Sequence, residues 1–383
     1  MLVSIFDDIA RENDQPRQEG EPLFSYLNKS SRPEAQRVRD LVDEWISEYP
    51  ESHRDGLVAR LRSDIDDHHQ SAFFELFLHK FLRARGCKII EIEPKLQHTN
   101  KSPDILVEAP TGERFYLEGV LASGRSNQET AAYARLNTAL AAIDNVPSPN
   151  NFLSLTTEGL PTAPLSLKKL KRGVQSWIAG LPAGIAAKDA PPFSYEEHGC
   201  RVELRALPRS KPEEGARAMG MRNFPIAQIT PHQEIRPGLK KKASRYGELD
   251  LPYVVAIDCL SMYHHEEGVT DALLGEPYVA ITKLPDGSLK EEHLRRPDGI
   301  WYGPPNGQPQ NTRMSAVLAF FRIDAWNFVT KTGLIIPNPW AAKPLPALNL
   351  GIAELTLENG TYQRSEGSTV GTLLSMPANW PEE

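Results

Sequence analysis

Residues 71–121 read SAFFELFLHKFLRARGCKIIEIEPKLQHTNKSPDILVEAPTGERFYLEGVL, an apolar helix pattern followed by three short strand patterns. Three carboxylates stand in it: Glu75 within the helix pattern, Asp104 after Pro103, and Glu118 within the third strand pattern. An acid inside an apolar strand needs a partner, because an unpaired buried charge is costly. This stretch therefore decides the fold class and also holds the strongest functional signal of the sequence.

The same stretch predicts one helix and three strands. Apolar residues dominate from 68 to 85, and Gly86 is well placed to end a helix there. Apolar runs bounded by Pro, Gly or Asn predict strands at 87–93, 104–108 and 114–121. Residues 110–113 read as the turn between the last two strands. An Ala-rich helix over 127–143 and a strand over 152–156 follow, so the chain is predicted to be α/β, with a mixed central sheet flanked by helices.

The rest of the chain predicts parts on either side of this core. Residues 1–67 are predicted to form a helical cap, because apolar residues recur at helical spacing in 38–46 and 57–65. The core then spans 68–180, and 181–383 forms an α/β extension or second lobe. The further predicted elements are a helix (166–179), a connector rich in Pro and Ala (181–195), two strands (200–207 and 252–259), a basic helix (239–246) and a long surface loop (295–312).

The composition is that of a globular chain. Of 383 residues, 40% are apolar and 24% charged, and the apolar runs are too short for a membrane span. The start of the chain mixes Asp7 and Asp8 into apolar residues, unlike a secretion signal. Three cysteines without paired spacing argue against disulfides, so a reducing cytoplasm is expected. The net charge of -7 gives no global attraction to nucleic acid, so such binding requires local basic patches.

The register of the predicted hairpin decides whether two of the acids meet. If the turn closes as predicted, Glu108 lies near Arg114 or Phe115, and counting outward brings Asp104 opposite Glu118 or its neighbour. Directly opposed residues on one face have Cβ atoms about 5 Å apart, near enough for two carboxylates to hold one cation. A slip of one residue turns one acid away. Mg²⁺ suits such a pair, because it takes only one or two carboxylates and completes its shell with water and phosphate oxygens.

With these residues and elements, the segment resembles the PD-(D/E)xK, or restriction-endonuclease-like, superfamily, whose core runs helix, three strands, helix, strand. The likeness covers roughly residues 68–160 and rests on a short motif. It implies that Glu75, Asp104 and Glu118 bind Mg²⁺ or Mn²⁺, and that the backbone carbonyl of Gly119 joins the metal shell. It also implies metal-dependent hydrolysis of a phosphodiester in nucleic acid, DNA rather than RNA, often by a homodimer.

One position departs from the motif. Two residues after the third-strand acid the family usually keeps a lysine, which orients the attacking water and stabilises developing negative charge, and here stands Val120. Some members move this lysine to a neighbouring element, so Lys101, or Arg125 as a less usual substitute, is a candidate for its role. A glutamine and a tyrosine four apart in the next helix mark one branch of the family. Gln128 and Tyr133 are five apart and do not match it.

Two basic clusters are candidates for binding phosphates. They comprise Lys168, Lys169, Lys171 and Arg172 in one, and Lys240, Lys241, Lys242 and Arg245 in the other. Solvated helix faces carry such runs routinely, so alone each favours a structural role. If both flank the carboxylates in the fold, they would position a nucleic acid without reading its sequence.

Structural roles compete with the site at each acid taken alone. Glu75 can pair with an arginine nearby in sequence, Arg83 or Arg85. Asp104 can be a turn or strand-start residue. Glu118 is harder to explain in this way because its strand looks like core. The three acids together, in this order, favour a site.

Other motifs add little. The adjacent histidines at 68–69 and 264–265 point in different directions on any helix or strand, which argues against zinc. The sequence holds no GxSxG elbow, GxxxxGK[ST] loop or GxGxxG turn. Trp301, Tyr302 and Trp340 lie in Pro-rich segments, where they can stack on bases or pin the loops to the core.

The sequence thus leads to one main hypothesis and two alternatives. The first is a Mg²⁺-dependent DNA endonuclease. The second is an inactive nuclease-fold module that binds nucleic acid or a protein partner, with Val120 recording the loss of the lysine. The third is a structural or assembly protein, in which the three acids would lie apart.

Overall fold

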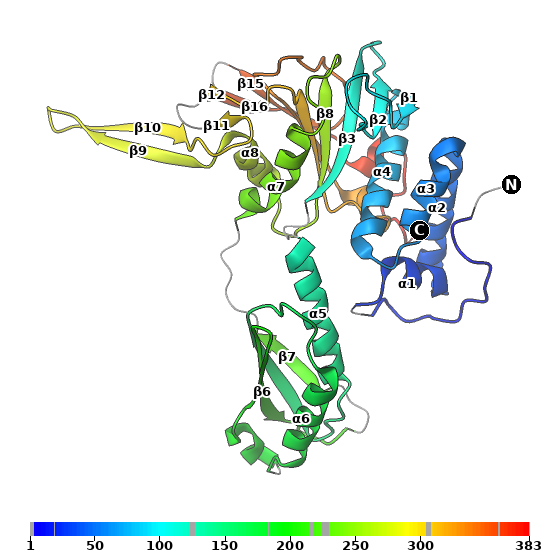
Figure 1. The fold of residues 1–383 in the computed structure, drawn as a ribbon, viewed down its shortest axis with the longest axis vertical. Helices are drawn as coiled ribbons and strands as arrows, with labels where there is room; N and C mark the ends of the chain where they lie inside the picture. The colour runs from blue at the N-terminus through cyan, green and yellow to red at the C-terminus, as the bar shows by residue number, and fades with distance from the viewer. Residues whose placement is uncertain are drawn as a thin grey trace. The chain divides into compact units, whose positions relative to one another are not determined.

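A large mixed sheet forms the centre of the larger of two compact units in this α/β protein, as its computed structural model shows (Figure 1). Its strand order is β1-β2-β3-β8-β13-β14-β15-β16. β8 pairs in parallel with β3 and β13, whereas β2 pairs antiparallel with β1 and β3. The strands are β1 (Lys88–Ile92), β2 (Ile105–Glu108), β3 (Arg114–Ala122), β8 (Tyr253–Cys259), β13 (Ala316–Phe321), β14 (Gly333–Pro337), β15 (Ala353–Glu358) and β16 (Thr361–Arg364). The structure describes residues 4–18, 20–122, 127–182, 184–213, 218–223, 230–303, 308–358 and 361–382.

Helices cover both faces of this sheet. Successive strand residues point to opposite faces, so Val254 of β8 packs in a core with α4, while Val255 packs in a second core with α7. α4 is buried along most of its circumference, as its run of phenylalanines and leucines predicts. The α4 face carries α1 (Leu23–Lys29), α2 (Pro33–Glu48), α3 (Glu51–Leu61) and α4 (Asp66–Ala84), and the other face carries α7 (Pro231–Ala243) and α8 (Glu266–Leu274).

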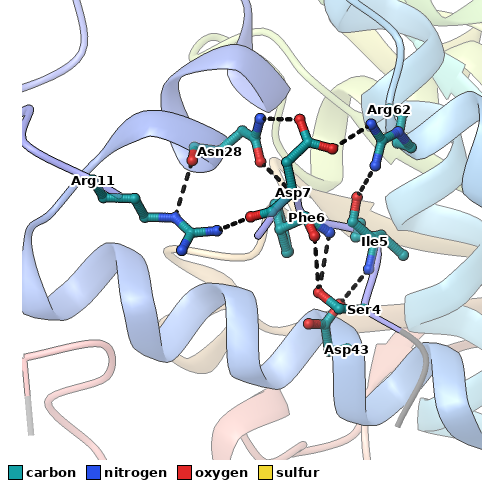
Figure 2. Close-up of polar contacts among 8 residues, drawn as sticks. All are labelled: Ser4, Ile5, Phe6, Asp7, Arg11, Asn28, Asp43 and Arg62. Carbon is teal, nitrogen blue, oxygen red and sulfur yellow. Dashed lines mark hydrogen bonds and ion pairs between the residues drawn. The ribbon is translucent and has the colours of Figure 1, made fainter. Parts of the chain in front are cut away.

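The segment before α1 is tied to this helical layer (Figure 2). The Asp7 carboxylate accepts hydrogen bonds from Arg62 at 2.7 Å and from the Asn28 amide at 2.8 Å. The backbone N–H of Ile5 donates to Asp43 at 2.8 Å, and the Ile5 carbonyl accepts from Arg62 at 2.6 Å. The helical cap predicted for residues 1–67 is present and shares one core with α4.

Residues Arg125–Ile229 form a separate compact unit, which we call the inserted unit. It has its own four-stranded sheet of order β5-β6-β4-β7 and its own apolar core. Its elements are α5 (Asn127–Asp144), β4 (Asn151–Glu158), α6 (Leu167–Ala179), η1 (Gly184–Asp189), β5 (Phe193–Glu197), β6 (Cys200–Pro208) and β7 (Met219–Asn223). Met1–Gly124 and Thr230–Glu383 together form the other unit, which we call the sheet unit.

This division corrects the predicted end of the core. The helix and strand predicted at 127–143 and 152–156 exist as α5 and β4, but they belong to the inserted unit. In the sheet unit the next elements after β3 are α7 and β8, and β8 is hydrogen-bonded in parallel to β3. The predicted boundaries after 67 and after 180 therefore differ from those observed. An amphipathic helix and an alternating strand look alike in either unit, so periodicity alone cannot detect an insertion.

Shorter elements complete the sheet unit. They are β9 (Pro277–Lys283) and β10 (Leu289–Arg295), which form an exposed hairpin, then β11 (Tyr302–Gly303), β12 (Gln308–Pro309), η2 (Phe328–Thr330) and α9 (Val370–Leu373). The loop predicted at 295–312 thus contains two very short strands. Trp301 is fully buried, and the Tyr302 ring stacks on Trp340 with centroids 6.0 Å apart, so these aromatics pin the segment to the core. Across the described residues, no helix has the length and apolar character needed to cross a bilayer.

Candidate functional site

The β2–β3 hairpin has the predicted register. Ile105 pairs with Leu117, and Glu108 pairs with Arg114. Continuing this register by one residue places Asp104 opposite Glu118. The Asp104 carboxylate accepts a hydrogen bond from the backbone N–H of Gly119 at 2.6 Å, which fixes the acid against β3. The two hairpin acids therefore lie side by side.

Glu118 is fully buried and is held by three side chains from the segment that follows the inserted unit. Lys242 donates to one carboxylate oxygen, and the Tyr246 hydroxyl donates to the other. A guanidinium nitrogen of Arg245 lies 3.5 Å from the oxygen that Lys242 contacts. Burial and then the Glu118 charge raise the pKa of Tyr246, so its hydroxyl stays protonated and can donate. The acid predicted to need a partner has a cationic one.

The close packing of α7 on β3 explains why the ammonium group comes from Lys242. α7 contacts β3 and β8 along this face. At Gly238 a Cβ would lie 3.5 Å from a methyl group of Val120, so the helix backbone passes close above that valine. Lys242 follows one turn later, where side chains project from the same helix face. Val120 thus fills an apolar contact, and the ammonium group that contacts Glu118 comes from α7.

The surroundings of Asp104 disfavour the charged form of its carboxyl. Its pKa is raised to about 7 by burial first and by the neighbouring charge of Glu118 second; Glu75 adds to the rise, whereas Lys242 and the Gly119 N–H oppose it. The Asp104 carboxyl therefore loses its proton at a higher pH than an ordinary aspartate does. A cation beside the two hairpin acids would relieve this repulsion.

Glu75 is on α4, as predicted, but it has its own partners. One carboxylate oxygen accepts a hydrogen bond from the Tyr49 hydroxyl at 2.7 Å, and the other pairs with Arg60 at 2.7 Å. The pairing arginine is neither Arg83 nor Arg85, the two that sequence proximity suggested. Within the described part of the chain, no group of three or more His, Cys, Asp or Glu side chains is placed to hold a metal ion. The three acids thus divide into a close pair and an ion-paired third member.

The remaining predicted residues have other positions. The Lys101 ammonium is exposed and donates to the backbone carbonyl of Arg245 at 3.2 Å, whereas the amino group at Glu118 is that of Lys242. Arg125 and the side chain of Gln128 lie outside the described residues. Lys240 and Lys241 are exposed on α7, the helix that carries Lys242. The other basic cluster, Lys168, Lys169, Lys171 and Arg172, lies on α6 of the inserted unit.

Sequence reasoning missed three residues of the site. Tyr246 follows Lys242 by four positions at the end of a basic helix, and this spacing was the available signal. Tyr49 ends α2 and Arg60 lies in the last turn of α3, and neither carries a signal in the sequence. Burial and the Glu75 charge raise the pKa of Tyr49, so it too remains a donor.

A pocket of about 330 Å³ opens beside these acids. Its lining includes Asp104 and Glu75, Ile92 and Glu93 at the end of β1, Tyr49, and residues of α3. A small polar group can therefore reach Asp104 from solvent.

No family model, curated protein or solved structure matches this chain.

Proposed function

We propose that this protein hydrolyses phosphodiester bonds of nucleic acid, most readily DNA, with the hairpin acids and Lys242 as its reactive centre. The observation that carries the proposal is that Asp104 and Glu118 lie side by side and that the Lys242 ammonium group donates to Glu118. The order α4, β1, β2, β3, α7, β8 supports it, because this is the helix, three strands, helix, strand order of restriction-endonuclease-like cores once the inserted unit is set aside.

The donor set suits a divalent cation. Asp104 and Glu118 offer carboxylate oxygens and Gly119 a backbone carbonyl, which are the hard oxygen ligands that Mg²⁺ or Mn²⁺ prefers. The raised pKa of Asp104 comes first from burial and second from repulsion by Glu118, and such an ion would offset both by stabilising the charged carboxylate. A bound divalent ion supplies positive charge for hydrolysis of a phosphodiester. Glu75, which pairs with Arg60 in the ligand-free structure, supports the site from α4.

The side chains around the pair have distinct roles. Lys242 stabilises negative charge that develops on the phosphate and orients the attacking water, the two tasks that valine at 120 cannot perform. Tyr246 fixes the Glu118 carboxylate through its hydroxyl. Lys240 and Lys241, exposed on the same helix, provide phosphate contacts that position the strand.

The test is cleavage of plasmid and linear DNA by the purified full chain with Mg²⁺ or Mn²⁺. Cutting by the wild type and its loss in Asp104→Asn would support the proposal. Asp286→Asn makes the same chemical change at an exposed turn residue and should cut like the wild type. The absence of metal-dependent cutting in the wild type would refute it. Sedimentation with and without DNA would test the homodimer that the resemblance implies.

A second function is a binding module without catalysis, and the valine at 120 is the observation that favours it. In that case Lys242 would only neutralise Glu118, and the exposed lysines of α7 would hold phosphates. DNA binding that weakens steeply with salt, together with no cutting under either metal, would select this function.

A further inference from the structure

The pocket beside Asp104 has a wall that belongs to the helical cap. α3 contributes Ser52, His53, Gly56 and Arg60, residues that repeat at a spacing of three to four and therefore lie on one helix face. α3 contacts α4, the helix that carries Glu75. The cap therefore brings hydroxyl, imidazole and guanidinium groups to the carboxylate side of the sheet.

Gly56 keeps this wall open. A Cβ at this position would meet nothing within 4 Å, so packing does not require glycine there. Glycine within a helix is destabilising relative to alanine, because its backbone loses more conformational freedom on folding. Since Gly56 lines the pocket, the missing side chain leaves space for a ligand.

Arg60 is placed to exchange partners. Its guanidinium pairs with Glu75 at 2.7 Å, and its side chain is 43% exposed while that of Glu75 is 19% exposed. Arginine binds phosphate through two parallel hydrogen bonds, a geometry that suits it better than a single carboxylate oxygen does. His53 and Ser52, which are hydrogen-bonded to each other at 2.9 Å, add polar groups to the same wall, and Glu75, Glu93 and Asp104 also line the pocket.

We propose that this pocket, which we call the α3 pocket, binds the sugar and phosphate of one unpaired nucleotide next to the bond that is cut. The inference rests on the proposed function for the position of that bond. The volume of about 330 Å³ accommodates one nucleotide and not a base pair with both strands. The substrate strand must therefore be single-stranded, frayed or flipped out where it enters the pocket, as for other enzymes that act on a single extruded nucleotide. On binding, Arg60 moves from Glu75 to the phosphate.

The experiment compares binding of a fluorescein-labelled single-stranded oligonucleotide with that of the blunt duplex of the same sequence, with Ca²⁺ in place of Mg²⁺. Gly56→Leu fills the α3 pocket and should weaken single-strand binding by about tenfold or more, equivalent to about 1.4 kcal/mol. Gly56→Ala adds one methyl group and should change it less than about twofold. Arg60→Gln should also weaken single-strand binding. Thermal unfolding of each variant checks that α3 still folds.

Two outcomes overturn the inference. If the folded Gly56→Leu variant binds the single strand as tightly as the wild type does, the α3 pocket is not the binding site. An equal loss for the duplex removes the claim for an unpaired strand. The proposed function is tested separately by cutting. If the wild type never cuts but Gly56→Leu loses single-strand binding, the α3 pocket binds the strand and the proposed hydrolysis is wrong. If the wild type cuts but Gly56→Leu binds the single strand normally, the proposed hydrolysis stands and the α3 pocket is not the binding site.

Discussion

Removing the ammonium group of Lys242 tests the centre of the site without assuming its chemistry. In Lys242→Met the fully buried Glu118 loses its main cationic partner, whose own side chain is only 12% exposed. Breaking a buried ion pair by deleting one member costs about 3–5 kcal/mol of unfolding free energy. Tyr246 and Arg245 remain at the carboxylate, and a hydrogen bond to a charged group is worth about 1.5–3 kcal/mol. We therefore expect a loss near the lower end, about 3 kcal/mol.

Equilibrium urea unfolding in metal-free buffer measures this loss. Lys241→Met is the matched control, because Lys241 is exposed on the same helix, and it should change stability by less than about 0.5 kcal/mol. A double-mutant cycle with Glu118→Gln isolates the pairwise contribution, since both single variants remove the same contact. A loss below about 1 kcal/mol for Lys242→Met, or additive effects in the cycle, would refute the buried pairing.

The same variant also reports on the proposed cation. Without Lys242 the two hairpin acids have less positive charge nearby, so added Mg²⁺ should stabilise Lys242→Met more than the wild type. An ion at a hundred times its Kd adds about 2.7 kcal/mol to the unfolding free energy. Equal Mg²⁺ effects on both proteins would contradict a cation at these acids.

Three further predictions concern catalysis and pH. Lys242→Met should lower DNA cutting by about 10²–10³-fold. Adding Val120→Lys should restore part of the cutting, because it returns an amino group to β3. A double variant as inactive as Lys242→Met would contradict the idea that Lys242 does the work of a lysine at position 120. Because the pKa of Asp104 is raised to about 7, protons compete with the metal for its carboxylate below that pH. At subsaturating Mg²⁺, the rate of cutting should therefore rise by up to about tenfold per pH unit below 7, and a flat pH profile would contradict this. Burial raises the pKa of Asp258 to about 7, above the ordinary 3.8, so its contribution to stability is present below about pH 4 and is lost as pH rises through 7. Asp258→Asn resembles the protonated carboxyl and does not titrate, so its stability relative to the wild type should rise from about pH 5 to about pH 8, and urea unfolding at both values checks this, a constant difference counting against it.

Much of the fold follows from local pattern. The helix predicted at 68–85 is α4 (Asp66–Ala84), and the strand predicted at 114–121 is β3 (Arg114–Ala122). Both are strongly apolar and end at glycine or polar residues, so tertiary packing reinforces what the local sequence favours. Long-range pairing is different. β8 lies next to β3 in the sheet, although the whole inserted unit separates them in the sequence. Pairing between segments so far apart produces no periodic pattern in the sequence.

The candidate site divides in the same way. The opposition of Asp104 and Glu118 was predictable because a turn and a two-residue alternation fix a hairpin register over a few residues. The pairing of Glu75 with Arg60 was not, since it depends on how α3 packs on α4. The inserted unit also separates Lys242 from Glu118 by 124 residues, so a search near Val120 examines the wrong segment.

The position of Lys242 shows what a site requires of its residues. The buried Glu118 carboxylate needs a cationic partner. A lysine on β3 or a lysine on α7, the helix packed across β3, could place an ammonium group beside this carboxylate. Placing it on α7 makes it depend on the packing of α7 over β3, which Gly238 and Val120 set at close range. Widening that contact should therefore impair the site without altering any polar group. Gly238→Val would press against Val120 and the backbone carbonyl of Leu121, and we expect it to reduce cutting along with stability, whereas Lys241→Met on the same helix should leave stability unchanged.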